Sequence, residues 1–302
     1  MLISDNQKIP KILSATSKII LARKQKQQEL LSIKKKKKKK KIISIPIEPR
    51  KLCFDKQDTF EIFAYCSKNY SDAFNFVMPS WSRCESVSKI TVYTDWNYTY
   101  SDNKVEIIPM FQNSSDWIVG TGRRLDVIKK YSEDNGVSNK QVLFLDIDCY
   151  LVRNVLEVFN YEFDIAISRL NSKESHTNQT ATAGLWFARL NDGYFNFIDQ
   201  WFKTASDFKR LGIGLQKYHI SYVQYSFTQV AKQKTNNYDV MPIDENKYNS
   251  EHTLENKWIE KIIKYKPSIL HYKGRRFRDI DLVKKTLTFA GEYEHSICDI
   301  NR

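Results

Sequence analysis

The chain has 302 residues, of which 41% are hydrophobic and 13% aromatic, and it carries a net charge of +13. A chain of this length and composition can bury one sizeable core. No window of 18 apolar residues is present, which argues against a membrane-spanning helix. The five cysteines are odd in number and form no C-x-x-C pair, which argues against a disulfide framework and against a zinc site.

Residues 1–50 are predicted to form a basic tail, disordered or partly helical, ahead of a folded domain over residues 51–302. The tail contains Lys34–Lys41, an unbroken run of eight lysines. Like charges repel, so this run is typical of a solvated linker. It would also suit an anionic membrane surface, nucleic acid or another polyanion, and the sequence leaves this choice open. We expect a cytoplasmic protein, with peripheral membrane contact through the lysine run as the alternative.

After the tail, short apolar runs alternate with amphipathic stretches. We predict strands, in chain order, over residues 60–65, 89–94, 104–110, 141–147, 163–168 and 183–190, and a late strand and loop over residues 268–274. Helices are predicted over residues 71–77, 123–133, 194–206 and 221–231. Alternating strands and helices indicate an α/β domain with a mostly parallel sheet.

The stretch QVLFLDIDCYLV, residues 141–152, follows an apolar run with Asp146-Ile147-Asp148. Residues i and i+2 of an extended strand face the same way, so we expect the two carboxylates to point together while Ile147 points into the core. In open α/β sheets, ligands bind outside the carboxyl ends of strands. Two oxygen ligands there suit Mg²⁺ or Mn²⁺, with substrate phosphates completing the coordination. The alternative is a pair that nearby lysines or backbone N–H groups satisfy.

This segment resembles the D-x-D signature of nucleotide-sugar-dependent glycosyltransferases with the GT-A fold. The likeness is to the glycogenin-like, lipopolysaccharide galactosyltransferase-like and nucleotide-diphospho-sugar transferase families, and it covers residues 58–280. Segments that resemble further motifs of these families, in the right order, are CSKNYSDAF (66–74), GRRL (122–125), TAGLWFARL (182–190), VQYSFT (223–228), PIDENKYNS (242–250) and ILHYKGRRF (269–277). Each segment alone is a loose match, whereas their shared order is hard to obtain by chance.

The resemblance implies a three-layer, Rossmann-like GT-A sandwich and a function. A sugar would pass from a nucleotide-diphosphate donor, implied to be a UDP-sugar, to a glycan, lipid-linked, protein or modified nucleic-acid acceptor, with retention at the anomeric carbon. Asp146, Asp148 and His271 would bind Mn²⁺ or Mg²⁺, with Asp146 contacting either the metal or the ribose. Gln224 would lie beside the reacting sugar as a catalytic residue. The residues implied to bind the nucleotide are Asn69, Tyr70, Arg124, Lys273, Gly274, Arg275 and Arg276.

The chain departs from the family pattern at several positions. Thr182 and Ala183 replace polar residues that the families usually carry, and Val223 stands where an Asp is expected. Phe277 occupies the position of a late Lys. Neutralisation of the donor phosphates would then pass to Lys273, Arg275 or Arg276, and an Arg could bind a phosphate in bidentate fashion.

Two other functions compete with this interpretation. A haloacid-dehalogenase-type phosphatase also places D-x-D at a strand end, but that family prefers Thr or Val where this chain has Tyr150, and it places the motif near the start of the domain. A non-enzymatic protein would use the basic tail to bind a polyanion, with the α/β domain as a scaffold.

Overall fold

The computed structural model describes residues 50–110, 117–168, 181–212, 222–233, 235–251 and 258–272, together with residue 287. Its contacts divide the chain into residues 1–49 and residues 50–302, and only the second unit is described here. The predicted tail and its lysine run therefore lie outside the described residues, except for Arg50. None of the described helices is both long enough and apolar enough to cross a membrane.

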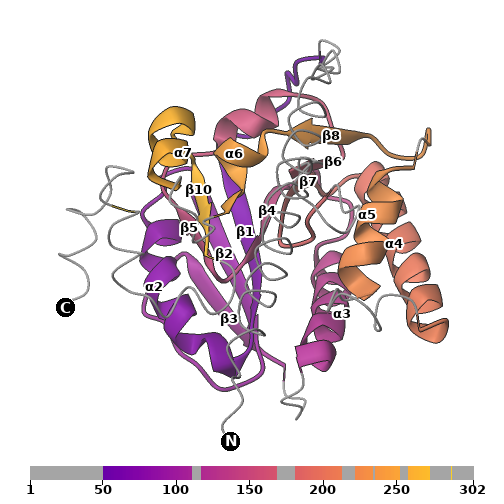
Figure 1. Ribbon diagram of the computed structural model, residues 1–302, viewed down its shortest axis with the longest axis horizontal. Coiled ribbons are helices and arrows are strands. Elements are labelled where there is room, and N and C mark those ends of the chain that lie inside the picture. The colour runs from indigo at the N-terminus through magenta and orange to yellow at the C-terminus, as the bar shows by residue number, and fades with distance from the viewer. Residues whose placement is uncertain are drawn as a thin grey trace, which may run out of the picture. The chain divides into compact units, whose positions relative to one another are not determined.

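A seven-stranded sheet with the order β3-β2-β1-β4-β7-β6-β8 forms the centre of residues 50–302 (Figure 1). Its first half consists of parallel strands: β1 (Phe60–Cys66), β2 (Val87–Thr94), β3 (Val105–Pro109) and β4 (Gln141–Asp146). The second half consists of β6 (Ile165–Ser168), β7 (Leu185–Arg189) and β8 (Val240–Ile243). Strand β7 runs antiparallel to both β4 and β6, whereas β6 and β8 are parallel. The predicted mostly parallel sheet is confirmed, with β7 reversed.

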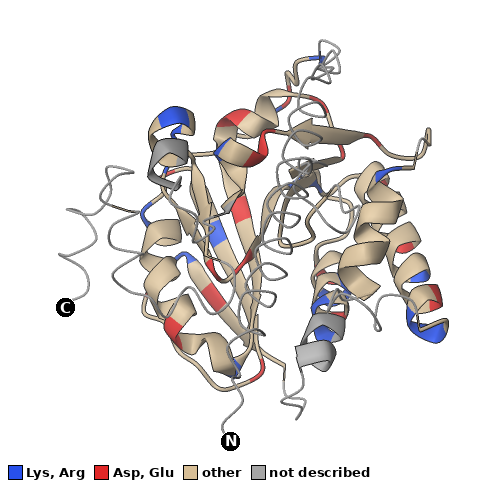
Figure 2. Ribbon diagram, in the orientation of Figure 1, with Lys and Arg blue, Asp and Glu red and all other residues tan. Residues whose placement is uncertain are grey.

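Helices cover both faces of this sheet and complete three layers (Figure 1). Helix α2 (Ser71–Ser82) packs on one face, against alternate strand residues that include Leu143 and Leu145. The opposite face carries α3 (Trp117–Asn135), α4 (Asp192–Arg210) and α5 (Tyr222–Ala231). Basic and acidic residues alternate along α4, as expected for a helix with one solvated face (Figure 2). The helices predicted over residues 71–77 and 123–133 are real but longer than expected.

Aromatic side chains fill the layer between the sheet and helices α3, α4 and α5. Phe144 of β4 and Trp186 of β7 are cross-strand partners, and their rings stack with centroids 3.8 Å apart. Trp201 of α4 meets Trp186 edge to face. Both tryptophans are fully buried, so they belong to the core and offer no sugar-binding platform.

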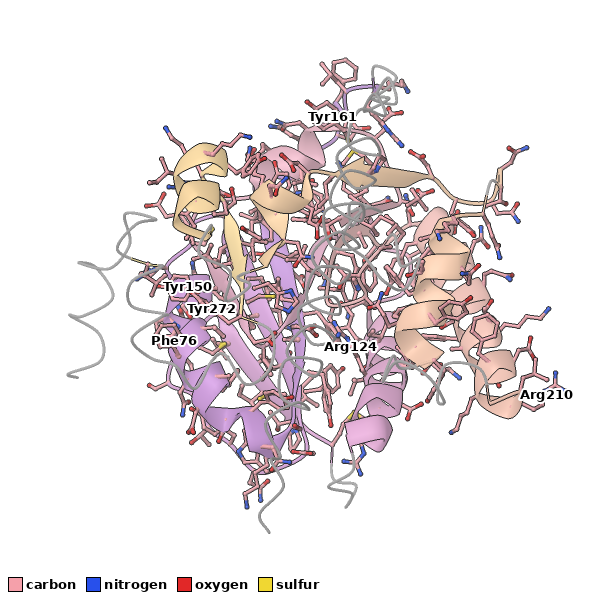
Figure 3. All side chains as sticks on the ribbon, in the orientation of Figure 1. Phe76, Arg124, Tyr150, Tyr161, Arg210 and Tyr272 are labelled. Carbon is pink, nitrogen blue, oxygen red and sulfur yellow. The ribbon has the colours of Figure 1, made fainter. Side chains whose placement is uncertain are left out.

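A second sheet of three short strands lies beside the end of β4. Its strands are β5 (Cys149–Leu151), β9 (Ser250–Glu251) and β10 (Ile269–His271), with β10 in the middle. Helix α2 holds this sheet, because Trp81 Nε1 donates to Cys149 O at 2.9 Å. Phe76 of α2 also contacts the Tyr150 ring, with centroids 5.6 Å apart (Figure 3). Two short helices, α6 (Glu245–Tyr248) and α7 (Trp258–Tyr265), flank β9 in the sequence.

The small sheet differs from the sequence prediction in a way that matters for the site. The strand and loop expected over residues 268–274 include β10, whereas β5 and β9 were not expected. Strand β5 follows the turn after β4 and pairs antiparallel with β10, with Cys149 opposite His271. This pairing brings a residue from late in the chain next to the D-x-D segment.

Candidate active site

The carboxyl end of β4 brings together the three side chains that the sequence assigned to a metal. Asp146 is the last residue of β4, and Asp148 follows in the turn before β5. His271 Nε2 lies 3.2 Å from Asp148 Oδ1 and 3.9 Å from Asp146 Oδ2. Backbone bonds fix the two ends of this group, since Asp146 N donates to Gly184 O at 2.7 Å and Tyr272 N donates to Asp148 O at 2.9 Å.

Strand alternation, as expected from the sequence, does not account for this convergence. Residues 141–147 were expected to be one extended strand, so that alternation would direct both carboxylates the same way. The strand ends at Asp146 instead, and Ile147 and Asp148 form a turn. The turn and the β5–β10 pairing, rather than strand alternation, direct both carboxylates toward one imidazole. Ile147 is buried, as expected.

Partial burial of two carboxylates beside His271 costs free energy when both carboxylates are charged. The side chains of Asp146, Asp148 and His271 are 33%, 12% and 3% exposed. Burial raises the pKa of Asp146, and Asp148 raises it further, while Arg124 and His271 act in the opposite direction. Two carboxylates that share a partly desolvated space favour a proton or a bound cation between them.

One cation already contacts Asp146. Arg124 of α3 forms a short ion pair with the Asp146 carboxylate, and it extends from the side of α3 that faces the sheet (Figure 3). The neighbouring Arg123 pairs with Asp95, after the end of β2, at 3.7 Å. The side chains of both arginines are less than a fifth exposed, so neither lies on a solvated helix face. A phosphate contact by Arg124 stays a prediction.

The segment before β7 approaches Asp146 so closely that a side chain at residue 184 would displace the Asp146 carboxylate. A Cβ on Gly184 would lie 2.2 Å from Asp146 Oδ2 and 3.3 Å from His271 Cε1. Gly184 lies in the segment TAGLWFARL, and no role was expected for it. A glycine at the start of an apolar strand marks a site of close backbone approach, and this signal was available.

Gln224 of α5 holds the same segment in place. Its Oε1 accepts from Ala183 N at 2.8 Å, and its Nε2 donates to Ala181 O at 2.6 Å. Gln224 therefore supports the backbone next to Gly184. The catalytic role expected for Gln224 stays a prediction.

The residues expected to bind the nucleotide are only partly described. Asn69 and Tyr70 lie in the 3₁₀ helix η1 (Lys68–Tyr70), directly after β1, and Tyr70 is 36% exposed. Because β1 pairs parallel with β4, their carboxyl ends lie at the same edge of the sheet. Lys273, Gly274, Arg275 and Arg276 follow β10 and lie outside the described residues.

The donor set at the end of β4 fits a divalent cation. Ligand atoms of Asp148, Cys149 and His271 all lie within 4.8 Å of one another. Carboxylate oxygen and imidazole nitrogen are suitable ligands for Mn²⁺, and carboxylates suit Mg²⁺. Burial raises the pKa of the Cys149 thiol, and Asp148 raises it further, which disfavours the thiolate needed for ligation. The ligand role expected for Asp146, Asp148 and His271 stays a prediction, and Cys149 is a neighbour that the sequence did not indicate.

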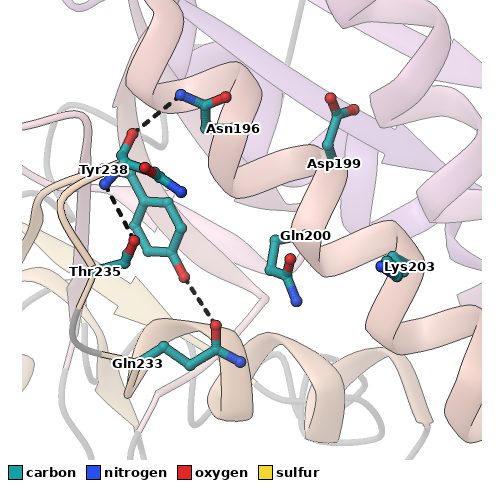
Figure 4. A pocket seen from close by; sticks show the side chains of 8 residues that line it. Asn196, Asp199, Gln200, Lys203, Gln233, Thr235 and Tyr238 are labelled. Atoms are coloured by element: carbon teal, nitrogen blue, oxygen red, sulfur yellow. Dashed lines mark hydrogen bonds between the residues drawn. The ribbon is translucent and has the colours of Figure 1, made fainter.

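A separate polar pocket of about 370 Å³ lies between α4 and the segment that follows α5 (Figure 4). Asn196 of α4 donates across it to Asn237 O at 3.1 Å. The residues that line the pocket are Asn196, Asp199, Gln200, Lys203, Gln233, Thr235, Asn237 and Tyr238. Since the lining includes none of the three ligand candidates, this pocket is distinct from the site at β4.

Several solved structures with similar chain traces are glycosyltransferases. They include the galactosyltransferase LgtC in complex with donor and acceptor sugar analogues (12% identity, 77% of this chain and 95% of that chain, TM-score 0.49). GlyE of Streptococcus pneumoniae TIGR4 has 13% identity over 72% of this chain, with a TM-score of 0.47. This chain spans only 55% of the GlyE chain. At these values the likenesses bear on neither activity nor substrate.

Sequence comparison gives a firmer result. No curated protein matches this chain. The nucleotide-diphospho-sugar transferase family matches residues 82–279, which is more than half of the chain and includes the whole site at β4. With the mostly parallel sheet, this match confirms the fold class and the glycosyltransferase family predicted from the sequence. The chain belongs to the nucleotide-diphospho-sugar transferase family.

Proposed function

We propose that this chain is a metal-dependent glycosyltransferase that transfers a sugar from a UDP-sugar, with retention at the anomeric carbon. The observation that carries the proposal is the convergence of Asp146, Asp148 and His271 at the carboxyl end of β4, in a chain of this family. Family membership supports a nucleotide-diphosphate donor. The uracil base and retention come from the resemblance of its motifs.

Each residue of the proposed site has a chemical task. Asp146, Asp148 and His271 would hold Mn²⁺ or Mg²⁺, and such an ion would stabilise the negative charge that develops on the departing diphosphate. Arg124 orients the Asp146 carboxylate through their ion pair. Gly184 leaves room for that carboxylate, and Gln224 fixes the segment that contains Gly184.

The outer parts of the proposed site rest on sequence. Asn69 and Tyr70 would contact the base and ribose, and Lys273, Arg275 and Arg276 would contact the phosphates, with Gly274 allowing close backbone approach. The acceptor is a glycan, a lipid-linked glycan, a protein or a modified nucleic acid. Lys34–Lys41 would place the enzyme at an anionic membrane surface in the cytoplasm.

The two competing functions have less support. A haloacid-dehalogenase-type phosphatase does not agree with the family match over residues 82–279. Release of phosphate from a generic phosphomonoester would nevertheless favour it. A polyanion-binding scaffold would lose its function when residues 1–50 are deleted. An enzyme would keep its activity on a soluble acceptor after the same deletion, so this experiment separates the two functions.

The direct test is a screen of sugar nucleotides with the full chain and Mn²⁺, in which release of the nucleoside diphosphate is measured. We expect hydrolysis of at least one UDP-sugar, abolished by EDTA and restored by added Mn²⁺. Hydrolysis that EDTA leaves unchanged would contradict metal dependence, and the absence of UDP release with every donor would contradict the proposed donor.

A further inference from the structure

The imidazole of His271 has a separate partner for each of its two nitrogens. Nε2 faces the carboxylates of Asp146 and Asp148, as described above. Nδ1 lies 2.8 Å from the amide oxygen Oδ1 of Asn249. His271 is 3% exposed and Asn249 is fully buried, so water has little access to this hydrogen bond. The Asn249 amide therefore influences which nitrogen of His271 carries a proton.

Asn249 is held from two directions. It follows α6, where its backbone N–H donates to Glu245 O at 2.9 Å, and it directly precedes β9, which pairs with β10. Its side-chain Nδ2 donates to Ser168 Oγ at 3.1 Å, and Ser168 is the buried last residue of β6. With Nδ2 used by Ser168, the amide presents its oxygen to His271.

The chemistry of this arrangement selects one tautomer. An amide oxygen can only accept a hydrogen bond, and a neutral imidazole has a single N–H group. A proton on Nδ1 satisfies Asn249 and leaves Nε2 with a lone pair directed at two carboxylates. A lone pair facing acceptors is unfavourable until a proton or a metal ion lies between them, so Nε2 is the nitrogen through which His271 can bind a metal. Metal-binding histidines commonly donate their second N–H to such a partner.

We propose that Asn249, oriented by Ser168, is a positioning residue that keeps a proton on Nδ1 of His271 and so reserves Nε2 for a divalent cation. This inference rests on the proposed function, since it concerns the same cation. Asn249 lies in the segment PIDENKYNS, and the sequence alone indicated no role for it.

The first test follows the proton on His271 and needs no metal. The full chain, labelled with ¹⁵N-histidine, is examined by NMR at pH 8, and the His271 signal is identified by its loss in His271→Gln. We expect a protonated Nδ1 both without metal and with Mg²⁺, and a shift away from this state in Asn249→Leu. An unprotonated Nδ1 in the unaltered chain would overturn the proposal.

The second test measures Mn²⁺ affinity by electron paramagnetic resonance, in variants first checked for folding by thermal unfolding. Asn249→Leu should weaken Mn²⁺ binding by ~10–100-fold, as is usual when the partner of a ligand is lost. Asn249→Asp keeps a hydrogen-bond acceptor, so its Mn²⁺ affinity should fall by less than ~10-fold. This variant keeps the proposal testable if Asn249→Leu fails to fold. Asn246→Leu is the matched control, because Asn246 lies in α6 and bonds to Asp244. This control should bind like the unaltered chain.

The outcomes separate this inference from the proposed function. If the unaltered chain binds Mn²⁺ and Asn249→Leu binds it equally well, the role of Asn249 is wrong while the metal site stands. If the unaltered chain binds no Mn²⁺, the metal-dependent function is wrong and the inference falls with it. If Asn249→Leu and Asn246→Leu weaken binding equally, the effect is one of general packing, and the proposal is overturned.

Discussion

Two glycines in this fold press against aspartates, and the two contacts differ in kind. A Cβ on Gly184 would lie 2.2 Å from Asp146 Oδ2, and a Cβ on Gly193 would lie 2.1 Å from Asp164 Oδ2. Asp164 accepts from Asn191 Nδ2 and from Asp239 N, both at 2.7 Å. Both carboxylate oxygens of Asp164 therefore accept hydrogen bonds from neutral donors. These bonds connect the start of α4 with the starts of β6 and β8.

Asp146 has the opposite surroundings. It shares its space with Asp148 and His271, and it is ion-paired with Arg124. Burial raises its pKa despite that arginine. The contact at Asp164 stabilises the fold through hydrogen bonds. The contact at Asp146 holds its carboxylate near that of Asp148, and a bound cation would stabilise the two together. Close packing against an aspartate therefore does not by itself indicate function. The negative charge that the carboxylates of Asp146 and Asp148 bring together is what distinguishes the candidate site.

The largest effect should come from the carboxylate in the turn after β4. Asp148→Ala should lower turnover of the sugar nucleotide by at least the ~10–100-fold that is typical of perturbed metal sites. Asp164→Ala, which removes the carboxylate of the structural contact, is the control and should leave Mn²⁺ affinity unchanged in the folded fraction. Full activity of Asp148→Ala in a donor hydrolysis assay would contradict the proposed site.

Gly184→Ala should damage the site and spare the fold. The added methyl group would meet the far end of the Asp146 side chain, which can rotate away and lose its position beside His271. We expect Mn²⁺ affinity to fall by ~10–100-fold with little change in Tm. Titration calorimetry together with thermal unfolding checks both parts. An unchanged affinity would mean that the position of Asp146 does not matter for binding.

Gly193→Ala should give the reverse result. Displacement of Asp164 loses two hydrogen bonds worth ~0.5–1.5 kcal/mol each, and the alanine returns up to ~1 kcal/mol of helix propensity. The free energy of unfolding should therefore fall by up to ~3 kcal/mol, measured by urea denaturation. Mn²⁺ affinity should not change. A loss of affinity here equal to that of Gly184→Ala would erase the distinction between the two contacts.

The smallest effect concerns the stability of the metal-free protein. Because the pKa of Asp146 is raised on folding, this group favours the folded state at low pH and loses that contribution as pH rises through its folded pKa. Asp146→Asn removes the charge, so in EDTA its Tm should be slightly above that of the unaltered chain at pH 8. The difference should shrink toward pH 4. A variant that is less stable at pH 8 would show that the Arg124 ion pair outweighs burial.

The sequence predicted six of the seven strands of the central sheet, because apolar runs such as Val142–Leu145 leave little choice of structure. It missed the edge strand β8, which has four residues. Strand direction has no local signature, so the reversal of β7 could not be predicted. Strands β5 and β9 have three residues and two residues, too few for a periodic pattern. Their formation depends on pairing with β10, more than a hundred residues after β5 in the chain.

The candidate site was also predictable only in part, because it depends on contacts between segments that are distant in the chain. Asp146, Asp148 and His271 carry motif-like spacing and could be proposed together from the resemblance. The role of Asn249 arises from an approach between segments that are distant in the chain, and no local pattern records it. For Gly184, the glycine ahead of an apolar strand indicates a close approach, but it does not indicate that Asp146 is the neighbour. The ion pair of Arg124 with Asp146 likewise needs the packing of α3 against the sheet.

The most direct test of the central claim is a crystal structure of the chain with Mn²⁺ and UDP, with data collected at a wavelength where manganese scatters anomalously. The account predicts an anomalous peak among Asp146, Asp148 and His271, in contact with the diphosphate. An empty position there, with Arg124 and His271 alone neutralising the two aspartates, would contradict it.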